Sequence, residues 1–265
     1  MLALKLILVP LSLLIVSMSG KWWGPSMAGW LAALPVVAGP ILFLLVLAHG
    51  PAFGARAATL ALSAVLTLEA YNFAYAWSCR SRSWQVSLGI GLAAWLVSAF
   101  AISLLPVSPW WAALVALVAV CFGQSFLPRS SAVAASSPLT RTDLAGRMFA
   151  GAALTICVTS LSSWTGPAWS GLLAVFPVLG TTLTVSSHRA HGPEYVISLV
   201  RGMVLGRFSF AAFCLVLAVA LTHQPPSLVF LAAAICAMLT QWVTSRFTKR
   251  RRASATEEPE VITAD

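Results

Sequence analysis

The sequence predicts an all-α polytopic membrane protein with about nine transmembrane helices, arranged as two inverted four-helix repeats joined by a single connecting helix. Composition indicates the membrane class, because 59% of the 265 residues are hydrophobic, 9% are charged and the mean hydropathy is +0.90. A soluble domain carries about 25% charged residues. Long apolar runs alternate with short polar segments, and the period-two alternation of outer-membrane strands is absent.

An internal repeat indicates the architecture. Residues 24–51 (GPSMAGWLAALPVVAGPILFLLVLAHGP) align without a gap to residues 166–193 (GPAWSGLLAVFPVLGTTLTVSSHRAHGP) at an offset of 142 positions, with eleven identities. Shared leucines mean little in so apolar a chain. Shared proline, glycine and histidine mean more, because they set backbone breaks and place a polar group. Membrane repeats of this kind often belong to transporters.

Nine apolar runs are long enough to cross a bilayer. They lie near residues 3–21, 26–48, 54–77, 84–105, 109–127, 147–165, 168–187, 200–222 and 226–247. The first run also resembles a signal peptide, with Lys5, an apolar core and small residues near Ser17. The repeat favours its retention in the mature protein. At the same offset Lys5 matches Arg147 and Trp22 matches Trp164, so the sixth run copies the first.

Basic residues indicate the orientation of these spans. One side of the membrane receives most of the lysines and arginines, whereas the other holds little beyond Arg56 and Lys5. The basic side carries Lys21, Arg80, Arg82, Arg129, Arg141, Arg189, Lys249, Arg250, Arg251 and Arg252. Lys and Arg accumulate in cytoplasmic loops. We therefore expect a multi-pass protein of a bacterial inner membrane, with its N-terminus outside and its C-terminus in the cytoplasm.

Span order then divides the chain. We expect a first repeat over residues 1–105, a connecting helix with a cytoplasmic loop over 106–145, a second repeat over 146–248 and a disordered cytoplasmic tail over 249–265. An odd number of spans separates each matched pair, so the two repeats are expected to be inverted. The tail is basic and then acidic, and a lipid-binding basic cluster is the alternative to a solvated end.

Prolines interrupt the second and seventh spans at matching positions. A proline removes one backbone donor and frees the carbonyl a turn earlier. Paired broken helices point to a transport site near the midplane, because half-helix ends offer dipoles and unpaired backbone groups. The residues expected at these breaks are Pro35, Gly39, Pro40, Pro177, Gly180 and Thr181. The alternative is a pair of kinks that serve packing.

Glu69 is the only acidic residue within an expected span, with Asn72 close by. A carboxyl group in hydrocarbon is costly, so Glu69 is a candidate proton carrier or the partner of a buried cation. Arg201 and Arg207 lie in the eighth span. Arg207 overlaps Glu69 in expected depth, which predicts an ion pair between them. Either arginine could instead contact an anionic substrate, and Arg201 could extend to the cytoplasmic interface.

Two glycines accompany these arginines. Gly202 and Gly206 form a small-xxx-small pattern, which predicts the close approach of another helix.

His49 and His191 end the two aligned segments. Each could act as a gate or proton relay on its own side, or simply precede a Gly-Pro helix stop. His188, His191 and Glu194 form a weak metal candidate in one loop. We expect no metal and no cofactor. No nucleophile, metalloprotease or P-loop motif is present, so we do not expect an enzyme.

Together these observations predict a secondary transporter or lipid flippase, proton-coupled and acting on an anionic small molecule or lipid headgroup. The alternatives are an accessory or scaffold subunit of a membrane complex and an integral-membrane lipid-modifying enzyme. The expected partner is the lipid bilayer. A homodimer is compatible with nine spans but is not indicated, and the net charge of +9 is interpreted as an orientation signal rather than a nucleic-acid footprint. The architecture is similar to small bacterial transporters built from inverted repeats, which names no substrate.

Overall fold

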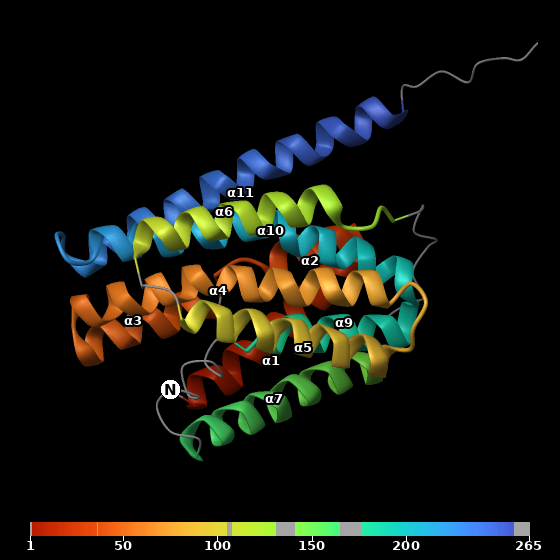
Figure 1. Cartoon of the computed structure of the whole chain (residues 1–265), viewed down its shortest axis with the longest axis horizontal. Helices are drawn as coiled ribbons and strands as arrows, with labels where there is room; N and C mark the ends of the chain where they lie inside the picture. The colour runs from red at the N-terminus through yellow and green to blue at the C-terminus, as the bar shows by residue number, and fades with distance from the viewer. Residues whose placement is uncertain (1, 36, 105–107, 131–140, 165–175, 257–265) are drawn as a thin grey trace, which may run out of the picture.

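The computed structural model describes residues 2–35, 37–104, 108–130, 141–164 and 176–256, and every regular element in them is an α-helix (Figure 1). The helices are α1 (Leu2–Trp23), α2 (Pro25–Ala32), α3 (Ala38–His49), α4 (Pro51–Ser78), α5 (Trp84–Ser103), α6 (Pro109–Phe126), α7 (Arg141–Trp164), α9 (Val178–His191), α10 (Pro193–Ala220) and α11 (Pro226–Thr256). Six of them, α1, α4, α5, α6, α10 and α11, are long and apolar enough to cross a membrane. The fold is therefore that expected of a helical membrane protein.

The His-Gly-Pro turns set matching helix boundaries. Gly50 (φ 86°) ends α3 and precedes α4, and Gly192 (φ 79°) ends α9 and precedes α10. A positive φ suits glycine, which has no Cβ to clash. Pro51 and Pro193 then occupy the first helical position, where the missing N–H has no intrahelical partner to lose. The same three residues thus build the same corner twice.

Helix boundaries repeat beyond the aligned segments. α4 and α10 are both 28 residues long, and Pro51 and Pro193 begin them at the 142-residue offset. α5 begins at Trp84 and α11 at Pro226, which preserves that offset. The correspondence of the third with the eighth span and of the fourth with the ninth therefore extends to their starting residues, and at Trp84 and Pro226 it does so without sequence identity.

The expected break at Pro35 is present. α2 ends at Ala32 and α3 starts at Ala38, so the apolar run over 26–48 forms two short helices instead of one span. Gly39 and Pro40 do not form the expected second break, because both lie in the first turn of α3. A proline is tolerated there, since the N–H it lacks would be unpaired in any helix start.

In the second repeat, Pro177 directly precedes α9, so a helix starts where the break was expected. Gly180 and Thr181 lie within the first turns of α9. The residues immediately before this start, 165–175, lie outside the described residues. The helix α9 accounts for the second part of the expected span over 168–187.

The disordered tail was expected from residue 249, but the last helix extends beyond that residue. α11 continues to Thr256, so residues 249–256 are helical, and residues 257–265 lie outside the described residues. The segment KRRRASAT consists mostly of lysine, arginine and alanine, which favour helix, and it contains no glycine or proline. The helix therefore has no local reason to stop at the last apolar residue.

α10 is the central helix of the bundle and packs against α2, α4, α6, α9 and α11. Its contact with α2 is made backbone to backbone. A Cβ added at Gly202 would overlap the Ser26 carbonyl, one at Gly206 would overlap that of Trp30, and one at Gly29 would overlap that of Leu199. The close approach predicted from Gly202 and Gly206 is therefore confirmed, with α2 as the neighbour.

Large apolar side chains point outward from α5, α6 and α11. Val97, Phe100, Leu117, Phe122 and Leu239 are all exposed. Side chains of this kind on the outside of a bundle suit a hydrocarbon environment, where no hydrophobic penalty attaches to exposure. The exposed faces thus agree with the six candidate spans.

Candidate functional site

An ion pair lies inside the bundle, between α4 and α10. The Nε of Arg207 donates to Oε1 of Glu69 at 3.1 Å. The Glu69 side chain is 4% exposed and that of Arg207 is 12% exposed. Arg207 lies about halfway along α10, and Glu69 lies in the second half of α4. The contact predicted from the overlapping depths of the two residues is therefore present.

A third helix, α6, closes the pair on one side. A Cβ at Gly123 would be 3.5 Å from Oε2 of Glu69 and 3.1 Å from Cγ1 of Val204. Glycine at this position is what allows α6 to approach the carboxylate. The ion pair is therefore enclosed by protein on this side.

Asn72 follows Glu69 by one helical turn and is buried at 2% exposure. It is close enough for its side chain to interact with the Glu69 carboxyl group. Neither Glu69 Oε2 nor Asn72 Nδ2, however, makes a hydrogen bond of ordinary geometry with the described residues. The site therefore keeps unused hydrogen-bonding capacity in a buried place, which is costly and calls for water or a ligand atom.

The chemistry of the pair follows from the different properties of its two groups. A guanidinium stays charged at any accessible pH, whereas a carboxylate can be neutralised by a proton. Within the described part of the chain, Arg207 uses one of its five N–H donors, at Nε. A proton on Glu69 would leave the guanidinium without its counter-charge, and an anion could then take the place of the carboxylate.

Arg201 is engaged elsewhere. Its Nη1 donates to the carbonyl oxygens of Leu127 at 2.9 Å and Pro128 at 3.3 Å, at the end of α6. In return, Nε2 of Gln124 donates to the Arg201 carbonyl at 3.2 Å. Cations suit a helix C-terminus, where carbonyls lack intrahelical partners. Arg201 therefore ties α6 to α10 and does not join Arg207 at the ion pair.

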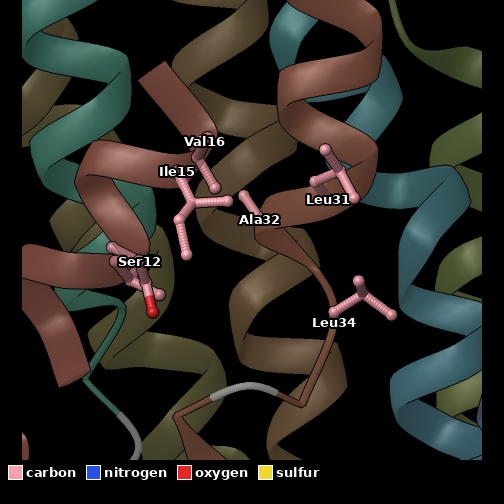
Figure 2. A pocket seen from close by; sticks show the side chains of 7 residues that line it. Ser12, Ile15, Val16, Leu31, Ala32 and Leu34 are labelled. Atoms are coloured by element: carbon pink, nitrogen blue, oxygen red, sulfur yellow. The ribbon is translucent and has the colours of Figure 1, made fainter. Parts of the chain in front are cut away.

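The break before Pro35 and the start of α9 meet at a small apolar pocket, shown in Figure 2. Its lining comes from α1, from the end of α2, from the break before Pro35 and from the first turn of α9. The lining residues are Ser12, Ile15, Val16, Leu31, Ala32, Leu34 and Leu179. Neither Glu69 nor Arg207 reaches this pocket. The pocket and the ion pair thus occupy two separate places, and none of the six residues predicted at the breaks lines the pocket.

The two histidines have equivalent surroundings. His49 packs on Phe53 with ring centroids 4.7 Å apart, and His191 packs on Tyr195 at 4.4 Å. Each histidine is the last residue of its helix, and each aromatic partner lies four residues later, across the Gly-Pro turn. The repeat therefore includes a ring contact at both corners, in addition to the backbone turn.

Sequence reasoning missed a group of polar side chains between α4, α5 and α9. Tyr71 and Thr184 share a hydrogen bond of 2.8 Å between their hydroxyl oxygens, and the Tyr75 hydroxyl lies 3.3 Å from Nδ1 of His188. The only available signal was spacing: Tyr71 and Tyr75 are four residues apart, as are Thr184 and His188. Each pair therefore lies on one face of its helix.

Arg147 was also missed as an interior residue. It is 4% exposed, and its Nη1 lies 3.4 Å from the Ser17 hydroxyl of α1. Within the described residues, no three His, Cys, Asp or Glu side chains are grouped to hold a metal ion, so His188, His191 and Glu194 do not assemble into the weak candidate site.

No protein-family model, characterised protein or solved structure matches this chain.

Proposed function

We propose that this protein is a secondary transporter or lipid flippase of a bacterial inner membrane, coupled to protons and acting on an anionic small molecule or lipid headgroup. The observation that carries the proposal is the Glu69–Arg207 pair, buried at a contact of 3.1 Å between two candidate spans. Ionisable residues at membrane depth are expensive and usually mark ion or substrate pathways. Stability alone does not explain a buried ion pair, because apolar residues of similar volume often stabilise a protein as well or better.

Coupling would follow from exchange at Arg207. Proton uptake by Glu69 removes the negative charge that holds the guanidinium. Arg207 then needs another anion, and a carboxylate or phosphate of the substrate supplies it. Return of the carboxylate expels the substrate and releases the proton. Proton and anion therefore move together, and the net charge at the pair stays near zero throughout.

The motion in this proposal uses two inverted halves. The proposed halves are residues 1–105 and 146–248, with α1 to α5 in the first and α7, α9, α10 and α11 in the second, and nine spans are proposed in all, with α2 and α3 as one broken span. Matched starts at Pro51 and Pro193 support equivalent roles for α4 and α10, which carry the two members of the ion pair. A displacement of one half against the other would then act directly on the contact between Glu69 and Arg207. The break at Pro35 and the start of α9 after Pro177 would supply places where short helices can shift.

A liposome experiment tests the proposal. Purified protein is placed in vesicles of phosphatidylethanolamine and phosphatidylglycerol that contain a pH-sensitive dye, and inorganic phosphate or a short-chain phosphatidylglycerol is added outside. We expect acidification of the lumen with the native chain, at least tenfold slower acidification with Glu69→Gln, and partial retention with Glu69→Asp. The matched control is Glu194→Gln, which removes an acid at the start of α10, away from the pair.

Acidification by Glu69→Gln at the native rate would contradict proton coupling through Glu69. If Arg207→Ala also left all cellular functions intact, the accessory-subunit alternative would be favoured. Product formation from lipid in detergent without any gradient would instead favour the lipid-modifying enzyme.

A further inference from the structure

Eight polar residues lie on three neighbouring helices, and we call this group the polar seam. Its members are Tyr71 and Tyr75 of α4, Ser87 and Trp95 of α5, and Thr181, Thr184, Ser187 and His188 of α9. All except His188 are buried at 7% exposure or less. No acid and no arginine belongs to it. Such a concentration of buried polar groups between candidate membrane helices needs a reason, since each unpaired group costs free energy in an apolar interior.

The seam is organised in two tiers. In the first tier the hydroxyl groups of Tyr71 and Thr184 share a hydrogen bond of 2.8 Å. In the second tier, nearer the C-terminal end of α9, the Tyr75 hydroxyl lies 3.3 Å from Nδ1 of His188. A Cβ on Gly91 of α5 would lie 2.9 Å from the Tyr71 ring and 3.5 Å from the Tyr75 ring. Gly91 thus brings α5 against both tyrosines. Because α5 residues four apart share a face, α5 adds polar groups on either side of this glycine.

Four buried polar atoms of the seam lack a hydrogen-bond partner among the described residues. They are Oγ of Ser87, Nε1 of Trp95, Oγ1 of Thr181 and Oγ of Ser187. Buried polar atoms in native proteins are paired with protein or ordered water in the great majority of cases. A polar site of this kind, with several donors and acceptors, supplies the hydrogen-bonding partners that a buried water molecule needs.

The seam extends from the C-terminal end of α9 toward the ion pair. His188 is partly exposed, and the next residue, Arg189, is exposed and lies over the Trp84 ring at 5.4 Å. In the other direction, Asn72 lies on the α4 face between Tyr75 and Glu69, because the three residues are spaced by three. The unpaired Nδ2 of Asn72 continues the row of atoms without protein partners.

We infer that the polar seam is a water-bearing proton route from the end of α9 at His188 to Glu69. Hydroxyl groups and water both donate and accept hydrogen bonds, so a chain of them can pass a proton along without net displacement of any side chain. The route rests on the proposed function, because it supplies the protons that Glu69 would couple to transport. Because the route ends at His188, protons would reach Glu69 from the side of the membrane on which His188 lies.

The test follows the carboxyl proton of Glu69 directly. The full-length protein in phosphatidylglycerol-containing vesicles is transferred to D₂O, and exchange is read from the shift of the Glu69 carboxylic C=O stretch. That band is assigned by its loss in Glu69→Gln. We expect Tyr75→Phe to slow the exchange at least about tenfold, the change in rate that loss of one hydrogen bond can make. Tyr195→Phe is the matched control, because it removes an equally buried hydroxyl outside the seam and should exchange at the native rate.

A second variant keeps the test decisive if Tyr75→Phe does not fold. Ser187→Val replaces a buried, unpaired hydroxyl by two methyl groups that exclude water, and it should slow the exchange likewise. Native exchange rates in both seam variants would overturn the route while leaving proton coupling at Glu69 intact. A Glu69 carboxyl band that never appears at any pH at which the protein stays folded would overturn both the route and the proposed coupling.

Discussion

Removing one member of the ion pair should cost far more than removing both. The contact is 3.1 Å long and its groups are 4% and 12% exposed, so neither charge has bulk water to replace its partner. Breaking a buried pair from one side costs about 3–5 kcal/mol, and an isolated charge at the centre of a membrane helix costs about 2.5–3.5 kcal/mol. Glu69→Gln leaves Arg207 charged and without its partner, so either cost predicts a loss of about 3 kcal/mol in unfolding free energy.

The two single variants should also differ in their response to pH. A carboxylate left alone by Arg207→Met can be neutralised by a proton, whereas a guanidinium left alone by Glu69→Gln cannot. The unfolding free energy of Arg207→Met should therefore rise as the pH falls and Glu69 takes up a proton, whereas that of Glu69→Gln should not depend on pH through this site. The assay is unfolding in micelles by denaturant at several pH values, with the double variant completing a mutant cycle.

The double variant should recover most of the lost stability, with a coupling free energy of about 2 kcal/mol or more. If each single variant lost less than about 1 kcal/mol of unfolding free energy and the two changes were additive, as for ion pairs exposed to water, Glu69 and Arg207 would not stabilise each other as a buried pair should.

Three further changes test the packing around the site. Gly202→Ala should destabilise by about 1–3 kcal/mol because its Cβ would overlap a carbonyl of α2, whereas Gly89→Ala, which has nothing within 4 Å, should be neutral or slightly stabilising in the same unfolding assay. Gly50→Ala and Gly192→Ala should each cost about 1–2 kcal/mol through the positive φ alone, since the space around both is open, and equal losses in thermal unfolding would check the equivalence of the two corners. Arg201→Met should loosen the end of α6 and raise its amide hydrogen exchange, without slowing the proton-coupled acidification by vesicles.

Features set by backbone chemistry were predictable from the sequence. The break at Pro35 follows from a missing donor, and the corners at Gly50 and Gly192 follow from the conformational freedom of glycine. The Glu69–Arg207 contact was predictable for a different reason: membrane depth restricts which charged groups can meet, and Glu69 was the only acid available within the expected spans.

Other features depend on tertiary contacts that leave no local trace. Pro40 is typical of a helix break in the sequence. Whether a proline breaks a helix or lies in its first turn depends on where the helix starts, and the sequence does not fix that start to within a few residues. Arg201 binds backbone carbonyls, which every residue possesses, so its partner could not be identified by type. The polar seam joins α4 to α9 across more than a hundred residues, and hydroxyl groups on an apolar helix usually bond their own backbone.

The sidedness of the two His-Gly-Pro corners tests the inverted arrangement most directly. Ala48 and Ala190 are the best probes, because they are identical positions of the repeat and both are exposed. Cysteine at the adjacent Gly50 or Gly192 would be strained by the positive φ. Each alanine is replaced singly by cysteine in a cysteine-free background, and a membrane-impermeant thiol reagent is applied to intact and to lysed cells. Inverted halves predict labelling at position 48 from outside and at position 190 only after lysis. Labelling of both positions from the same side would contradict inverted halves, and with them the proposed rocking motion around Glu69 and Arg207.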